Sequence, residues 1–382
     1  MTQAQIILFT IGLIATIWLL HGYLTVRLLQ MFSIRARIGL LLSLLITLGL
    51  LALTYLSRVI ELPELAWLSR FTFYELGWLV LTLPWLLLLD ALLLLSRLSQ
   101  HCFACCHGRY NPWSLYQAYK KQLAIGFLLA SFLLTGIAWL QFQRDIVINQ
   151  ITLTSPKVSE TYRLLHISDV QLGSVSPAHV EKIGRAMQHA IERYDIDLIL
   201  NTGDQVDSAS YTPAQLDPIA YTSPPTFFSL GNHEFYHDQQ RILDILQAQR
   251  QIILRSQRAS FKELNIIGID DIRDPQVLVA QLKQQKLVQS GLYNILLFHR
   301  PIGVIEAKQQ GIDLMLSGHT HGGQIFPITL IVKWLNDYPQ GLTLLDQFAL
   351  YTTDGAGLWG PNLRLGTQNE IAVITLQPAE PR

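Results

Sequence analysis

The chain has 382 residues, which gives room for two or three domains. Half of the residues are hydrophobic and only 15% are charged, whereas soluble domains carry about 25% charged residues, so composition excludes a chain lying wholly in water. The 28 basic residues balance the 28 acidic ones, and this zero net charge excludes recognition of nucleic acid through a global positive field.

Four long apolar stretches lie near the amino terminus, and each reaches the about 20 residues that a helix needs to cross a bilayer. They cover 5–26, 38–57, 76–96 and 122–143. Buried helices of a soluble bundle would need polar faces at helical period, and these stretches have almost none. The sequence therefore predicts a four-helix transmembrane region over 1–143, a linker over 144–154 and a second domain over 155–382.

Basic residues are unevenly distributed among the loops between these stretches. The first and third loops are rich in Arg and Lys, whereas in the second loop Glu residues offset the two arginines. By the positive-inside rule, the first and third loops lie in the cytoplasm. We therefore expect a multi-pass protein of the cell or inner membrane, with its second domain outside the cytoplasm.

Two features of the membrane region invite a functional interpretation. All three cysteines lie in HCFACCHG (101–108), but no second C-x-x-C closes a zinc site, so reduced thiols in a cytoplasmic loop are the simpler interpretation. Asp90 lies inside the third stretch, where an ionisable group is costly. Helix packing or a polar pair explains it more simply than catalysis, and we leave its role unassigned.

From about residue 155 the pattern changes to short apolar runs typical of strands buried on both faces. The runs cover 161–168, 196–202, 225–230, 293–298 and 312–317. Helical periodicity predicts a helix over 178–194, with further helices around 238–249 and 275–286. Strands that alternate with helices indicate an α/β fold.

Polar residues follow each of these runs. In chain order they are Asp169, Gly203-Asp204, Gly231-Asn232-His233-Glu234, His299 and Gly318-His319-Thr320-His321-Gly322. Taken singly, each fits a turn or a hydrogen-bonded histidine. Because ligand sites in α/β sheets gather at the carboxyl ends of strands, the whole set predicts oxygen and nitrogen donors that converge on a polynuclear metal site.

This series of motifs resembles the calcineurin-like metallophosphoesterases, and the ending GAGLWGPNLRLGTQNEIAVITL (355–376) is similar to their membrane-anchored branch. The motifs are GD-x-x-D, GNHE, H-x-P and GHTHGG, preceded by D-x-Q where the family has D-x-H. The resemblance covers roughly residues 155–377. It implies two packed mixed β-sheets flanked by helices, and a metal-dependent phosphoric ester hydrolase, either phosphodiesterase or phosphatase.

The resemblance also implies two divalent cations, with Asp204 as the shared bridging ligand. The expected ligands are Asp169, Gln171, Asp204 and His321 for the first cation, and Asp204, Asn232, His299 and His319 for the second. Such a mixed oxygen and nitrogen set suits manganese best, with iron, zinc or magnesium as alternatives. Together the cations would acidify a water for in-line attack on phosphorus.

Four further residues receive expected roles. His233 would protonate the leaving oxygen, and the resemblance implies that Asp207 orients it. Arg300 and Arg364 could meet substrate phosphate, although surface ion pairs explain them more simply. Glu234 is expected to support the turn.

Gln171 is the one departure from the family pattern, since an amide oxygen is a weaker ligand than imidazole. Three outcomes remain open: a two-metal site shifted toward manganese or magnesium, a second metal recruited only with substrate, or a binding domain without activity.

We therefore expect a membrane-anchored phosphoesterase that hydrolyses a phosphodiester or pyrophosphate bond, with the lipid bilayer as a partner and a membrane-associated or lipid-linked substrate. The alternative is a metal-binding sensor or regulatory membrane protein with weak or no catalysis. Phosphoprotein phosphatase activity would use the same site.

Overall fold

The computed structural model describes residues 3–59, 66–102, 112–207, 213–221, 223–236 and 238–379. The chain divides into two compact units, Met1–Trp139 and Leu140–Arg382, which we call the helical unit and the catalytic unit. Most of HCFACCHG (101–108) lies outside the described residues.

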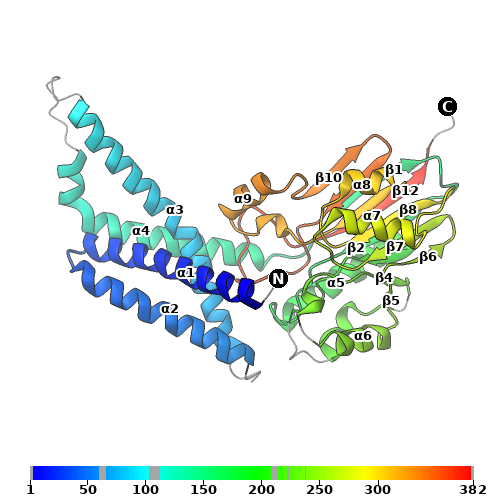
Figure 1. The fold of residues 1–382 in the computed structure, drawn as a ribbon, viewed down its shortest axis with the longest axis horizontal. Helices are drawn as coiled ribbons and strands as arrows, with labels where there is room; N and C mark the ends of the chain where they lie inside the picture. The colour runs from blue at the N-terminus through cyan, green and yellow to red at the C-terminus, as the bar shows by residue number, and fades with distance from the viewer. Residues whose placement is uncertain are drawn as a thin grey trace. The chain divides into compact units, whose positions relative to one another are not determined.

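Helices α1 to α4 make up the helical unit (Figure 1). Their bounds are Gln3–Met31, Ala36–Val59, Ala66–Cys102 and Pro112–Phe142. Within the described side chains, two segments are long and apolar enough to cross a membrane, Phe71–Leu98 and Trp113–Phe142. Of the four spans expected from the sequence, two are thus found among the described residues. Described residues of α2 give only a shorter apolar stretch, Ile38–Leu53, and much of the first expected span has no described side chains.

Asp90 forms the polar pair that the sequence suggested. Its carboxylate accepts from Arg27 Nε at 2.6 and 2.9 Å and from the Tyr23 hydroxyl at 2.8 Å. Arg27 Nη1 in turn donates to the Tyr116 hydroxyl at 3.0 Å. These contacts link α1, α3 and α4, and pairing makes an ionised side chain tolerable between apolar helices.

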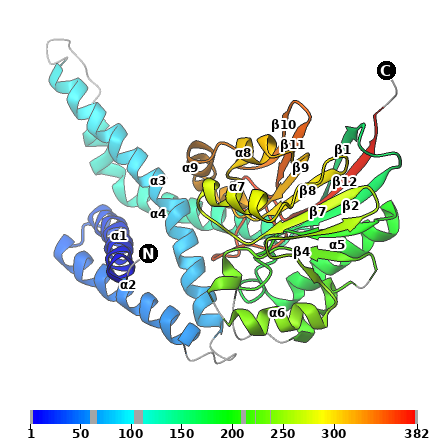
Figure 2. The same cartoon turned by 45° about the vertical axis from the view of Figure 1, so that its right-hand side comes forward.

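Two six-stranded mixed sheets form the catalytic unit, as the family resemblance implied (Figures 1 and 2). The first has the order β1-β12-β2-β3-β4-β5 and the second β10-β11-β9-β8-β7-β6. The strands of the first sheet are β1 (Val147–Ser155), β2 (Tyr162–Ile167), β3 (Leu198–Asn201), β4 (Thr226–Phe228), β5 (Ile252–Ile253) and β12 (Glu370–Pro378). Those of the second are β6 (Gln257–Phe261), β7 (Leu264–Ile269), β8 (Tyr293–Phe298), β9 (Leu314–Ser317), β10 (Gly341–Leu345) and β11 (Phe348–Thr352).

The five predicted apolar runs are continuous because the strands that they form, β2, β3, β4, β8 and β9, are buried on both faces. Side chains such as Leu164 and Leu297 pack in the core that both sheets share, whereas the next residue along, Leu165, packs in a separate core with α5. The helices of this unit are α5 (Pro177–Tyr194), α6 (Gln239–Ala248), α7 (Pro275–Gln284), α8 (Val304–Gln309) and α9 (Ile328–Leu335). The helices expected over 178–194, 238–249 and 275–286 are therefore present.

Strand β1 replaces most of the linker that was expected over 144–154. It pairs in parallel with β12 over nine residues. At the end of α4 the ring of Phe142 is buried and stacks on His179, with ring centroids 4.6 Å apart, while Asn369 Nδ2 donates to the Phe142 carbonyl at 2.9 Å. Phe142, the last residue of α4, is thus part of the core of the catalytic unit, and four residues separate it from β1.

Candidate metal centre

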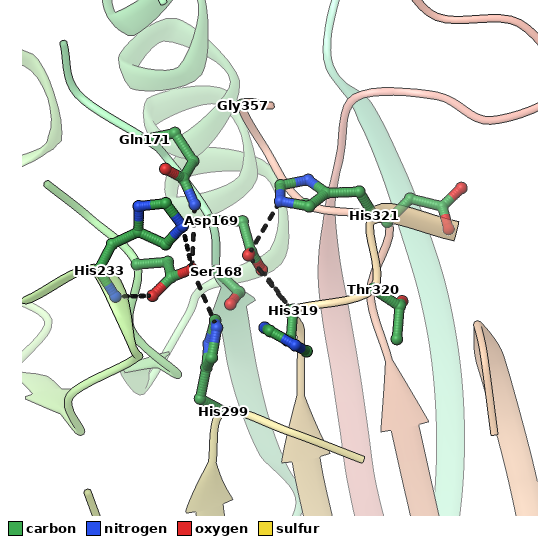
Figure 3. Close-up of polar contacts among 12 residues, drawn as sticks. Ser168, Asp169, Gln171, His233, His299, His319, Thr320, His321 and Gly357 are labelled. Carbon is green, nitrogen blue, oxygen red and sulfur yellow. Dashed lines mark hydrogen bonds and ion pairs between the residues drawn. The ribbon is translucent and has the colours of Figure 1, made fainter. Parts of the chain in front are cut away.

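The predicted site residues meet where the strands of both sheets end (Figure 3). Asp169 and Asp204 follow the parallel strands β2 and β3, and Asn232 follows β4. His299 and His319 follow β8 and β9, which are parallel neighbours in the second sheet. The site therefore forms across the two sheets, as the strand-end pattern predicted.

Asp204 lies at the centre of the cluster and is 1% exposed. Its Oδ2 lies 3.0 Å from His299 Nε2, 3.0 Å from Gln171 Nε2 and 3.7 Å from His233 Nε2. Its Oδ1 accepts the backbone N–H of His233 at 2.9 Å. Nitrogen atoms from three separate loops thus surround one carboxylate.

Glu234 supports the loops after β3 and β4, as expected. Its buried carboxylate accepts four backbone N–H groups, at 2.7–3.1 Å. They belong to Asp204, Gln205, Val206 and Gly231. The two loops come so close that a Cβ on Gly203, whose φ is +93°, would lie 2.1 Å from Gly231 N, so only glycine fits there.

Five of the predicted ligands have left-handed backbone conformations, which L-residues rarely adopt. The φ angles are +55° at Asp169 and Gln171, +51° at Asp204, +71° at His319 and +49° at His321. Each costs on the order of 1–2 kcal/mol, so surrounding contacts must hold these residues in place. Backbone strain is therefore concentrated at the donors themselves.

One group of donors lies around His299. Ligand atoms of Asp204, His299 and His319 all lie within 4.8 Å of one another. Nδ1 of His299 donates to the Thr202 carbonyl at 2.9 Å, which turns Nε2 toward Asp204. Asn232 joins this group through Arg300, whose Nη2 donates to Asn232 Oδ1 at 3.2 Å while Nη1 lies 2.7 Å from His319 Nε2.

The other group lies around Asp169. Its Oδ1 is 3.4 Å from His321 Nε2, and Oδ1 and Oδ2 lie 3.3 and 3.1 Å from the His319 backbone N. Gln171 lies between the groups through its contact with Asp204. The structure therefore brings all seven predicted ligands into one connected cluster, in which Gln171 contacts the central Asp204.

The histidines of the cluster differ in protonation state. Burial, with nearby His299 and Arg300, lowers the pKa of His319 to about 2, and burial lowers the pKa of His321 to about 4. Both rings are thus neutral near pH 7, and the Nε2 lone pair of His319 accepts from Arg300 Nη1. At His299 burial opposes the charge of Asp204, and the carboxylate prevails and raises the pKa.

The donor set fits divalent cations of the first transition row. Three buried atoms of the predicted ligands have no hydrogen-bond partner: Gln171 Oε1, His299 Nε2 and His321 Nδ1. Such atoms are costly to bury unless a ligand satisfies them. His299 Nε2 also lies beside an anionic oxygen, a position in which a cation would stabilise both groups.

The proposed acid lies next to these donors. Nδ1 of His233 forms a short ion-pair contact with Asp207 Oδ1, and the Ser174 hydroxyl donates to Asp207 Oδ2. Asp207 thereby fixes the ring, so that Nε2 faces the Asp204 side of the centre. The geometry agrees with the orienting role expected for Asp207.

Arg300 forms an ion pair that is largely buried, whereas a surface ion pair seemed the simplest explanation for it. Its Nε donates to Asp271 at 2.7 Å, and both side chains are largely buried. Sequence reasoning missed Asp271, although it follows the end of β7 and the strand-end pattern could have found it. Asp271 holds the guanidinium against the donors Asn232 and His319.

The expectation that Arg364 meets substrate phosphate is wrong. The side chain is fully buried, and its guanidinium donates to side chains of the same loop and to backbone carbonyls. The carbonyls belong to His321, Asp354, Gly355 and Gly357, at 2.7–3.2 Å, and the side chains to Thr367 and Asn369. Arg364 holds the loop after β11 against His321, and no sequence signal indicated this role.

Comparison with known proteins agrees with this geometry. A family model described as "Calcineurin-like phosphoesterase" matches residues 162–323. An "Uncharacterized metallophosphoesterase" of Helicobacter pylori (strain J99) is 31% identical over 270 residues, covering 68% of this chain and 71% of that protein. A "Transmembrane protein with metallophosphoesterase domain" of Danio rerio is 28% identical over 337 residues, covering 82% of this chain and 74% of that protein. The second similarity is longer than the catalytic unit, so it extends into the helical unit.

Replacing Arg364 with methionine, which has similar length, tests its structural role. We expect a loss of about 3 kcal/mol or more in unfolding free energy, since several buried carbonyls lose their donor. Chemical denaturation of the purified protein measures it. Arg255→Met, which removes an ion pair with Asp270 near the surface, should cost less than about 1 kcal/mol. A stable Arg364→Met protein with only a raised KM would restore the substrate-binding role.

Proposed function

Because the chain belongs to the calcineurin-like metallophosphoesterase family, we propose that it is a membrane-anchored hydrolase that cleaves a phosphodiester or pyrophosphate bond with two divalent cations. The observation that supports this most is the convergence of donors from both sheets on Asp204, whose carboxylate contacts residues of both ligand groups. Manganese is the cation that we favour, since the donors mix carboxylate, amide and imidazole.

The two donor groups would hold one cation each, with Asp204 shared between them. Cations bound there would supply Lewis-acid polarisation of the phosphoryl group and lower the pKa of attacking water. Asp204 keeps its charge because nearby His299 holds its pKa below the ordinary value, although burial alone would raise it. Asp204 is therefore ionised near pH 7, whereas the raised pKa of His299 means that a bound cation would have to displace the proton on this ring.

His233 would donate a proton from Nε2 to the leaving oxygen, while Asp207 stabilises the protonated ring through Nδ1. Burial opposes protonation of His233, but its contact with Asp207 and the charge of Asp204 outweigh that and raise the pKa of the ring. Arg300 lies within reach of the same donors and would offset negative charge on the phosphoryl group.

The substrate is proposed to be membrane-associated. The chain passes from the end of α4 into β1 within four residues, so the catalytic unit cannot diffuse far from the bilayer. A tether of this kind raises the local concentration of lipid-borne phosphoesters relative to soluble ones. The bias of basic residues toward the first and third loops supports a catalytic unit outside the cytoplasm.

Asp204→Asn tests the proposed hydrolysis, because it removes the shared charge while it keeps the side-chain size. Wild-type protein supplied with Mn²⁺ should hydrolyse bis(4-nitrophenyl) phosphate, and the variant should lose more than about 100-fold of this rate, beyond the usual effect of an outer-shell group. Asp244→Asn, at an exposed position on α6, is the control and should keep full activity. Absent wild-type turnover would favour the metal-binding sensor instead.

His233→Asn should affect substrates unequally, because poor leaving groups need the proton most. On methyl aryl phosphodiesters, we expect a loss of about 100-fold or more for phenol and a much smaller loss for 4-nitrophenol. Steady-state rates across the series measure the dependence, and metal content should stay at the wild-type value. An equal loss for every leaving group would remove His233 from the role of acid.

Gln171→His should tighten binding of the first cation, because imidazole is a stronger ligand than an amide oxygen. We expect the affinity of the metal-free protein for Mn²⁺ to rise by about 10-fold or more, measured by competition with a fluorescent chelator. Gln188→His on the exposed face of α5 is the control. Unchanged or weaker affinity would mean that residue 171 does not act as a ligand.

A further inference from the structure

Helix α9 is an apolar helix that the folded core hardly covers. Of its eight residues, ITLIVKWL, only Thr329 and Lys333 are not apolar, and only Thr329 is buried. Trp334 is 84% exposed and Leu335 65%, and Leu330 and Ile331 are also exposed. Figure 2 shows the helix on the outside of the catalytic unit. An exposed apolar face of this kind in a folded domain marks an interaction site.

Helix α9 follows closely on the loop after β9, which carries the predicted ligands His319 and His321. The predicted ligand His321 begins a short turn that ends at Gly323, and α9 begins five residues after Gly323. A Cβ on Gly323 would lie 2.7 Å from the Cα of Thr329, so loop and helix backbones are in direct contact. Phe326 N donates to the Leu365 carbonyl at 2.8 Å, which fixes the helix to the same loop that Arg364 holds. Whatever binds α9 is therefore held at a fixed place relative to the centre.

A lipid surface fits this helix better than a buried protein contact. Eight residues extend about 12 Å, too short to cross a bilayer but suited to lying in its interface. Trp at one end and an exposed Lys333 beside the apolar face match the interfacial preference of indole rings and of lysines that reach headgroups. A bilayer crossed by the candidate span Trp113–Phe142 would also be close to the catalytic unit, because the chain continues from this span directly into that unit.

We propose that α9 inserts its exposed apolar face into the leaflet next to the catalytic unit and so holds the metal centre against the membrane. The bound partner is the lipid surface itself, through its acyl chains and, at Lys333, its anionic headgroups. This docking goes beyond hydrolysis, and only its consequence for lipid-borne substrates rests on the proposed function.

Fluorescence in the full-length protein tests the insertion. With Cys102, Cys105 and Cys106 replaced by serine, a single cysteine carries an NBD label at Trp334→Cys or, as control, at exposed Val277→Cys on α7. In nanodiscs of phosphatidylcholine and phosphatidylglycerol, nitroxide-labelled acyl chains should quench NBD at 334 by about 2-fold or more and leave 277 unchanged. No quenching at 334 overturns the proposal, and a blue-shifted but unquenched label means that protein covers α9 instead.

A kinetic comparison tests the consequence. Trp334→Glu combined with Leu335→Glu should lower hydrolysis of phosphatidyl-4-nitrophenol in the nanodisc by about 10-fold or more, because charge opposes insertion. Hydrolysis of soluble bis(4-nitrophenyl) phosphate should stay within about 2-fold, and Val277→Glu should change neither rate. Equal rates on the lipid substrate overturn the proposal. If wild type hydrolyses neither substrate, the proposed function fails, and the quenching measurement still decides the insertion.

Discussion

The rest of the catalytic unit depends on one constraint, the negative charge of Asp204, whose side chain is almost completely buried. An unpaired ionised carboxylate in such a place is far too costly, so partners must neutralise it. The structure supplies His299, the Gln171 amide and a backbone N–H, and it leaves ring and amide atoms nearby without hydrogen bonds. Cations bound there would satisfy these atoms and offset the charge of Asp204, which is why we interpret the site as a metal centre.

Two buried charged side chains keep the donors in their strained conformations. Glu234 collects backbone N–H groups of the loops after β3 and β4, and Arg364 collects backbone carbonyls of the loops after β9 and β11. Each takes the place that water would have in an exposed loop. Residues with positive φ, such as Asp204 and His321, lie within these loops, so the hydrogen bonds offset a conformational cost that turns alone would not sustain.

The metal site could be predicted from the sequence because its candidate ligands directly follow strands, and the carboxyl ends of parallel strands lie at the same edge of a sheet. That rule placed Asp169, His299 and His321 in one site without any knowledge of pairing. It could not reveal Arg364, since a buried arginine bound to carbonyls has no local pattern. Strand β1 was missed because it is an edge strand whose partner β12 lies more than 200 residues away, and because the alternation in its sequence is confined to QITLT (150–154).

The short connection from α4 to β1 would hold the catalytic unit at the membrane, and Phe142 at its start is part of the core of that unit. Anomalous diffraction from crystals of the protein loaded with Mn²⁺ tests most directly whether Asp204 is shared by two divalent cations. We predict two manganese peaks, both at ligand distance from the Asp204 carboxylate, one also at Asp169 and His321 and the other at His299 and His319. Absence of manganese at Asp204, or a single ion bound elsewhere, would contradict it.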